Sequence, residues 1–239
     1  MNKPSFVFFG SSQFSKYVLD VLASRDFIPV LNITSAKEPL PEIPEVDLYI
    51  VASFGKILPK EVIYRPKFKT LNVHPSLLPK LRGPSPIQGA ILGETSTGVS
   101  IMRMDEKMDH GPLIATKEIF IEPFPDYYST VEEKLGRAGG ELLVEVLPKW
   151  IAGEVEEQEQ NEAETTYTKM IQKEDSDISN DPTEVALRKV MAYEVWPRAR
   201  VGELIVSKAH IEDGKLVLDK VIPPGKREMV YADYLRGKR

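Results

Sequence analysis

The sequence predicts an α/β fold, in which a first domain with a mostly parallel sheet is followed by a small C-terminal β-barrel domain. In residues 1–151, apolar runs of strand length alternate with helical patterns, as they do in sheets whose strands are joined by helices. Residues 152–181 are acidic and polar, which is typical of a linker that crosses the surface. Residues 182–239 contain one helical pattern and three short strand-like runs separated by turn signals. We therefore expect two domains and a linker with these boundaries.

Six apolar runs predict the strands of the first domain. Residues 5–9 form a run that Gly10 stops, which is typical of a buried strand. The remaining strands are predicted at 29–33, 48–52, 69–73, 99–104 and 113–121.

Three helical patterns accompany these strands. Ser11 or Ser12 can cap a helix that continues to about Leu22, because apolar residues recur there at helical spacing. A short helix is predicted at 84–92 and a long one at 128–150.

The C-terminal part begins with a helix that Pro182 opens and that ends near Tyr193. Strands are predicted near 202–209, 215–221 and 228–231. This length of chain suits a small β-barrel or an open meander.

The composition is that of an ordinary globular protein of 239 residues, since 42% of them are hydrophobic and 28% charged. No apolar run approaches the ~20 residues that span a bilayer, and the N-terminus lacks a secretory signal pattern, so we expect a cytoplasmic protein without a membrane partner. The absence of cysteine excludes disulfides and thiolate ligands, and three scattered histidines give no reason to expect a metal site. Nothing in the sequence demands a dimer, and we expect a monomer.

The segment Gly10-Ser11-Ser12 follows the first strand, where a nucleotide-binding loop could lie. It contains a single glycine and matches neither GxGxxG nor GxxxxGK[ST]. A tight strand-to-helix turn explains it better, so the sequence does not support dinucleotide-dependent redox chemistry.

Two polar residues near the end of the strand at 69–73 are the first candidates for chemistry. Asn72 and His74 are two positions apart, so their side chains project from the same face of a strand. Pro75 follows at once and places the pair at the carboxyl edge of the sheet, where open α/β sheets bind ligands. An amide donor beside an imidazole can hold a carbonyl oxygen on which negative charge develops.

A carboxylate partner would orient the imidazole or take up a proton. Asp105 and Asp109 both follow a predicted strand, and chemistry alone does not choose between them. Asp109 precedes His110-Gly111, whose glycine would let the backbone approach a ligand closely.

Residues 71–88 and 97–114 together resemble the formyltransferase fold family, and within it the branch that acts on methionyl-tRNA. The family's Asn-x-His is present as Asn72-Val73-His74. Further matches lie at 82–88, 165–175 and 225–237. The resemblance implies a Rossmann-like formyltransferase domain with a mostly parallel sheet, plus a small OB-like C-terminal β-barrel.

The resemblance also implies a site. It assigns catalysis to Asn72, His74 and Asp109, and so chooses Asp109 over Asp105. Asn72 and a protonated His74 would stabilise the negative oxygen of the formyl group, while Asp109 would keep His74 charged and help to move a proton. The formyl donor would be 10-formyltetrahydrofolate, and no metal would be needed. The folate-binding residues would be Phe54, Gly55, Lys56, Ile57, Leu58, Ser76, Leu77, Leu78 and Pro79.

One block of the family is missing from this chain. Residues 35–46 bridge an interval in which the family has a long basic loop and a further helix–strand unit, and residues 36–44 are proline-rich with no room for a crossover helix. The resemblance assigns that loop to gripping the acceptor stem, so initiator methionyl-tRNA would have to be held elsewhere. Basic residues of the C-terminal domain would then contact its phosphates. The candidates are Arg188, Lys189, Arg198, Arg200, Lys208, Lys226 and Arg227.

Two other functions stay open at this point. A formyltransferase that acts on an amino sugar attached to a nucleotide would keep the same three catalytic residues and could tolerate the shorter interval. A non-catalytic folate- or RNA-binding module would have no need of all three.

Overall fold

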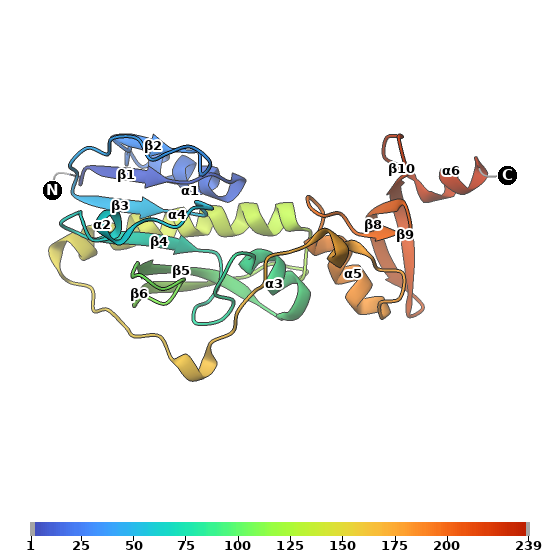
Figure 1. Cartoon of the computed structure of the whole chain (residues 1–239). Coiled ribbons are helices and arrows are strands. Elements are labelled where there is room, and N and C mark those ends of the chain that lie inside the picture. Colours follow the sequence, from blue (N-terminus) through green and yellow to red (C-terminus); the bar gives the residue numbers. More distant parts are fainter. Residues whose placement is uncertain (1–2, 238–239) are drawn as a thin grey trace. The chain divides into compact units, whose positions relative to one another are not determined.

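The computed structural model describes residues 3–237, which divide into two compact units (Figure 1). The first unit comprises the chain up to residue 86 together with residues 96–120 and 132–168. The second comprises residues 87–95, 121–131 and the chain from residue 169 onward. The stretch predicted as a linker is therefore shared between the two units, with the division after Thr168.

The first unit is built on a six-stranded sheet in the order β2-β1-β3-β4-β5-β6. Strand β1 pairs in parallel with β2 and β3, and β3 pairs in parallel with β4, whereas β5 runs antiparallel to both β4 and β6. The mostly parallel α/β sheet that the sequence predicts is thus confirmed, and the antiparallel strand β5 makes it a mixed sheet. The strands are β1 Phe6–Phe9, β2 Leu31–Ile33, β3 Leu48–Val51, β4 Thr70–His74, β5 Thr97–Arg103 and β6 Leu113–Ile119.

Helix α1 (Gln13–Ser24) begins where the sequence predicts, and the choice between the two serines falls on Ser12. The Ser12 hydroxyl accepts the backbone N–H of Ser15, which satisfies one of the free donors at the helix start. Gly10 lies in the tight turn before this helix. A larger residue would not fit there, because a Cβ at this position would lie 2.4 Å from the Cβ of Ser15.

Helix α4 (Tyr128–Ala152) is the long helix predicted at 128–150. Two glycines in its middle let it pack closely within the first unit. A Cβ on Gly139 would come within 2.6 Å of Val73 on β4, and one on Gly140 within 2.7 Å of Val21 on α1. The remaining helices of the N-terminal half are α2 Lys60–Ile63 and α3 Pro86–Gly93.

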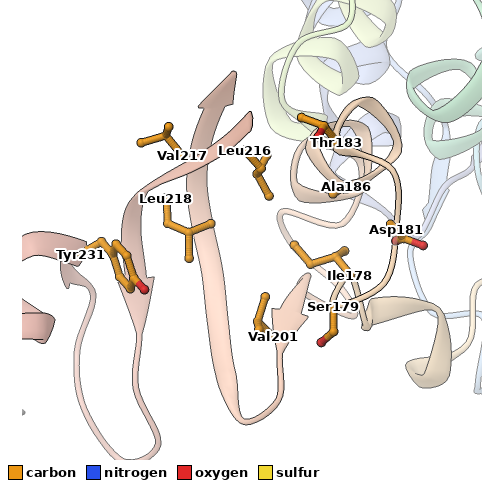
Figure 2. A pocket seen from close by; sticks show the side chains of 10 residues that line it. All are labelled: Ile178, Ser179, Asp181, Thr183, Ala186, Val201, Leu216, Val217, Leu218 and Tyr231. Atoms are coloured by element: carbon orange, nitrogen blue, oxygen red, sulfur yellow. The ribbon is translucent and has the colours of Figure 1, made fainter. Parts of the chain in front are cut away.

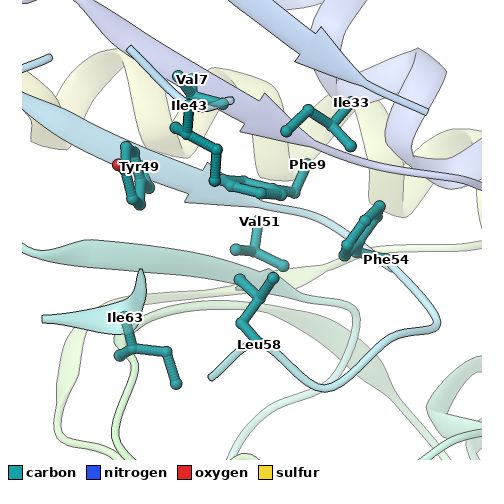
Figure 3. Close-up of a cluster of buried hydrophobic side chains, with 9 residues drawn as sticks. All are labelled: Val7, Phe9, Ile33, Ile43, Tyr49, Val51, Phe54, Leu58 and Ile63. Carbon is teal, nitrogen blue, oxygen red and sulfur yellow. The ribbon is translucent and has the colours of Figure 1, made fainter. Parts of the chain in front are cut away.

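An apolar cluster fills one side of the first unit's sheet (Figure 3). The ring of Phe9, on β1, meets Tyr49 and Phe54 edge to face at centroid distances of 5.5 and 5.4 Å. Ile43 packs into the same cluster from the connector between β2 and β3. This connector contains no helix, as its proline content predicts, and it covers the sheet with its own apolar side chains.

The second unit holds helix α5 (Thr183–Ala192) and a four-stranded antiparallel sheet in the order β10-β9-β8-β7. Ala186 and Val190 of α5 pack on Val206 and Ala209 of β8. The strands are β7 Arg200–Val201, β8 Leu204–Glu212, β9 Lys215–Ile222 and β10 Met229–Val230. Within the described residues β7 and β10 form the two edges of an open sheet, so the predicted OB-like barrel is not confirmed.

Four short helical segments were not predicted. One is α2, which follows β3. Two lie in the acidic stretch, as the 3-10 helices η1 (Glu162–Glu164) and η2 (Lys173–Ser176), and the fourth is helix α6 (Tyr231–Arg236). Among residues 3–237, no helix is long and apolar enough to cross a membrane.

The cluster in Figure 3 leads to a stability prediction. Phe9→Ala should lower the free energy of unfolding by about 3–5 kcal/mol, because Phe9 is fully buried and its removal leaves a cavity among close-packed rings. Phe120→Ala is the matched control, since Phe120 is 84% exposed and its loss should change the free energy by less than about 0.5 kcal/mol. Urea denaturation followed by circular dichroism measures both. Equal effects of the two substitutions would contradict this description of the core.

Candidate active site

Strand β4 carries Asn72 and His74 into the interior of the first unit, near the buried polar residues Thr70 of β4 and Ser100 of β5. Asn72 is paired with Val51 of β3 and Met102 of β5, and His74 lies opposite Ser100 of β5. The two side chains are on one face of the strand, as their spacing predicts, and both are buried, at 9% and 4% exposure. The strand ends at His74 and Pro75 follows, which confirms their position at its carboxyl end.

The two ring nitrogens of His74 face different partners. Nε2 lies 3.2 Å from the carbonyl oxygen of Leu81, and Nδ1 lies 3.6 Å from Oδ1 of Asp109. Because a carbonyl oxygen can only accept, the contact with Leu81 requires the proton on Nε2. A second proton on Nδ1, facing the Asp109 carboxylate, would give a charged imidazolium.

Asp109 reaches His74 from the loop between β5 and β6, with its backbone in the left-handed region at φ 51°. Its Oδ2 accepts the backbone N–H of Gly83 at 2.8 Å. The loop returns through Gly111, where a Cβ would come within 1.8 Å of the carbonyl oxygen of Arg103. We expected this glycine to permit close approach to a ligand, whereas the structure uses it for close approach to the protein's own β5.

The structure separates the two carboxylates that the sequence left equivalent. Oδ2 of Asp105 lies 2.7 Å from Nδ1 of His110, while Asp109 faces His74. The Nε2 of His110 in turn lies 3.7 Å from Glu162. Each aspartate thus has its own histidine, and Asp109 alone of the two shares a contact with the polar pair on β4.

The loop after β3, expected to bind folate, divides into buried and exposed residues. Phe54 and Leu58 are buried in the apolar cluster of Figure 3. Gly55 and Ile57 are exposed, the latter at 87%, and the ammonium of Lys56 donates to the carbonyl of Glu38. Phe54 and Leu58 therefore anchor the loop, and the backbone and side chains between them are the part available to a ligand.

The segment after β4 is organised in the same way. The Ser76 hydroxyl donates to the carbonyl of Lys80, and the Leu78 N–H donates to the hydroxyl of Ser100. Leu78 is buried, whereas Leu77 and Pro79 are partly exposed and remain available to a ligand.

A comparison with protein families matches residues 17–147 to the model described as formyl transferase. The chain belongs to the formyl transferase family. The matched residues include β4, the loop that carries Asp109 and most of α4, so the family assignment covers the polar pair and its partner. The protein is therefore a formyltransferase enzyme.

This formyltransferase is also similar in sequence to curated proteins over most of its length. A methionyl-tRNA formyltransferase of Bacillus licheniformis is 37% identical over 250 residues, covering 90% of this chain and 79% of the relative. One from Chloroflexus aggregans is 43% identical over 187 residues, covering 75% of this chain and 60% of the relative. The Bacillus match extends over more positions than this chain contains, so that relative has residues without a counterpart here.

Solved structures support the fold of this family member. HypX from Aquifex aeolicus gives a TM-score of 0.76 at 20% identity, over 99% of this chain and 48% of that protein. A methionyl-tRNA formyltransferase from Clostridium thermocellum gives a TM-score of 0.67 at 21% identity, over 92% of this chain and 99% of its own.

Several of the formyltransferase's candidate RNA-binding residues have partners inside the second unit. The Arg188 guanidinium donates to the carbonyls of Ile91 and Glu94, where it caps the end of α3. Lys189 forms a 2.7 Å ion pair with Asp181. Lys208 lies over the ring of Tyr127, with its Nζ 3.2 Å from the centroid, and 3.5 Å from Glu194. Arg188 in particular has both of these carbonyls as partners inside the protein.

The other candidate RNA-binding residues have fewer partners within the protein. Arg198, Lys226 and Arg227 are exposed, and among the described residues they form no ion pair. Arg200 is half-buried, and its Nε has no hydrogen-bond partner in the described chain. The three exposed cations are therefore the best placed to contact phosphates.

The second unit also contains a groove of about 530 Å³, and Asp181, the partner of Lys189, is one of the residues that line it (Figure 2). It is lined largely by apolar side chains, among them Leu216 and Leu218 of β9 and Tyr231 of α6. None of Asn72, His74 and Asp109 lines it, so the active-site candidate does not depend on it.

Proposed function

We propose that this enzyme transfers the formyl group of 10-formyltetrahydrofolate to the amino group of methionyl-tRNA for translation initiation. The observation that carries the proposal is the contact between Asp109 and His74 beside Asn72, at the carboxyl end of β4, in a chain whose curated relatives are named methionyl-tRNA formyltransferases. The alternatives are a different acceptor, such as a nucleotide-linked amino sugar, or a binding module without activity. Competition between acceptors separates them.

The residues present fit a folate donor. The Asn72 carboxamide forms no hydrogen bond with another described residue, although the residue is nine-tenths buried, so its donors are available to a ligand. The exposed Gly55 and Ile57 and the partly exposed Leu77 and Pro79 offer backbone and apolar surface. HypX, whose fold matches over 98% of this chain, was captured with tetrahydrofolic acid.

The chemistry follows from the three side chains. Bound 10-formyltetrahydrofolate supplies the formyl carbon that the amine attacks. Asn72 donates a hydrogen bond to the formyl oxygen as negative charge develops on it, and the charged His74 stabilises the same oxygen. Asp109 pairs with the charged His74 and, directly or through a water molecule, passes the proton released by the attacking nitrogen to the folate nitrogen. The negative oxygen then re-forms its carbonyl as the bond between the formyl carbon and the folate nitrogen breaks, so that tetrahydrofolate leaves and the amine carries the formyl group. No covalent enzyme intermediate and no metal enter this scheme.

Incubation of the purified chain with 10-formyltetrahydrofolate tests the acceptor. Methionyl-tRNA and an amino-sugar nucleotide are offered in competition, and each formylated product is quantified. We expect formylmethionyl-tRNA. Formylation of the sugar alone would reassign the acceptor while keeping the catalytic residues, and formylation of neither would favour the binding module.

Substitution of the polar pair tests the chemistry. Asn72→Ala and His74→Ala should each lower kcat by roughly 10²–10³, because each removes one group that stabilises the developing negative charge. Asp109→Asn should also be strongly impaired, whereas Asp105→Asn, the matched carboxylate with a different partner, should lose only a few-fold. Steady-state kinetics on variants with native circular dichroism measure these effects. Near-normal turnover in either alanine variant would contradict the assignment.

The salt dependence of tRNA binding tests the RNA contacts of the second unit. Replacing Lys226 and Arg227 together with alanine should reduce the slope of log K against log[salt] by about one for each phosphate that the variant no longer neutralises. The control replaces Lys189 and Lys220, whose charges are paired with Asp181 and Glu228. It removes the same charge and should change the slope less. Identical slopes in both double variants would exclude these residues as phosphate-binding groups.

A further inference from the structure

The stretch predicted as an acidic linker places a buried glutamine beside the Asp109 loop. Gln160 is 8% exposed, and its Nε2 donates to the carbonyl oxygens of Asp109 at 2.9 Å and Gly111 at 2.7 Å. Its Oε1 accepts from Nε and Nη2 of Arg82, at 3.1 and 2.8 Å. Both amide hydrogens and both lone pairs are thus used by protein groups.

These partners define the orientation of the Gln160 amide. If the amide were turned over, its NH₂ would face the guanidinium of Arg82 and its oxygen would face two carbonyl oxygens. That arrangement would replace four hydrogen bonds by repulsive contacts. The side chain is therefore a directional link between the guanidinium and the backbone of the loop.

Arg82 is a rigid support for this link. Its side chain is fully buried, and a buried cation is tolerated when it is paired and hydrogen-bonded. Nη2 and Nη1 donate to the two carboxylate oxygens of Glu162, at 2.7 and 3.3 Å. The hydrogen bond from Arg82 holds the pKa of Glu162 below its usual value, so Glu162 stays ionised at neutral pH.

The same stretch also holds the other side of Asp109. The N–H of Thr168 donates to the carbonyl of Arg82, and its hydroxyl accepts the N–H of Ser85. Gly83 lies between them at φ 113°, where a Cβ would come within 2.9 Å of the Thr168 carbonyl. The N–H of this Gly83 is the donor to the Asp109 carboxylate.

Asp109 needs such support for two reasons. Its φ of 51° lies in the left-handed region, which a non-glycine residue adopts at a conformational cost that its surroundings must offset. In addition, the strand register places Arg103, where the loop begins, opposite Leu71 at the start of β4, three residues or about 10 Å from His74 at its end. The loop must carry Asp109 along this distance.

We propose that Gln160 is a positioning residue for formyl transfer, which keeps Asp109 in the left-handed conformation that directs its carboxylate to His74. The proposal rests on the proposed function, since it takes Asp109 to act in that reaction. Gln160 itself bonds only protein groups, so its loss should lower kcat and leave KM nearly unchanged.

The first test uses NMR and needs no acceptor. Gln160→Glu removes both donors to the loop, and Gln160→Met removes them without adding a charge. Both should change the imidazole resonances of His74 in the same direction as Asp109→Asn. Gln158→Glu is the matched control, because Gln158 is exposed in the same stretch, and it should leave these resonances unchanged. Wild-type His74 resonances in both Gln160 variants would overturn the proposal, whatever the acceptor proves to be.

The second test uses kinetics and a double-mutant cycle. In the wild-type background Gln160→Glu should lower kcat by ~10- to 100-fold, the order expected for a misplaced catalytic group. In the Asp109→Asn background it should have little further effect, because the two residues act through one contact. An equal loss in both backgrounds would show a general structural role and overturn the proposal. A wild-type enzyme that leaves methionyl-tRNA unformylated would instead refute the proposed function, and the NMR result would still decide the role of Gln160.

Discussion

The backbone of Asp109 adopts a positive φ, and this conformation brings its carboxylate to the imidazole of His74. The other features of the site are arranged around this contact. The N–H of Gly83 holds the carboxylate, and the amide of Gln160 holds the carbonyl of the same residue. Gly111 lets the loop return past Arg103, which no larger residue would allow. A strained backbone persists where its surroundings over-determine it, and such strain clusters at functional sites.

The sheet supplies the other half of the contact. Strand β4 lies between a parallel neighbour, β3, and an antiparallel one, β5, so its backbone is fixed on both sides. Asn72 and His74 are therefore held by a rigid element, whereas Asp109 is held by a loop that depends on side-chain hydrogen bonds. In the proposed mechanism these groups need placement within a fraction of an ångström, and the buried Arg82, through Gln160, is the contact that we propose meets this need for the loop.

Local patterns in the sequence were sufficient to predict the six strands of the first unit, a helix capped by one of two serines, and the shared face of Asn72 and His74, because each depends on neighbours within a few residues. They were not sufficient to predict the role of Gln160, since a polar stretch without periodicity carries no signal of partners about 50 and 80 residues away. For the same reason Asp105 and Asp109 were equivalent on chemistry alone. The charge of Arg188 suggested phosphate, while its actual partners are the backbone carbonyls of Ile91 and Glu94 at the end of α3.

The proposed chemistry requires that the carboxyl end of β4 hold the formyl oxygen. The most direct measurement is a crystal structure of the enzyme with a stable formylated folate analogue. We expect the formyl oxygen at about 2.7–3.1 Å from the Asn72 amide nitrogen, on the side of the strand that His74 occupies, with the Asp109 contact intact. A formyl group bound away from β4, or an Asn72 amide turned to a protein partner in the complex, would contradict this placement.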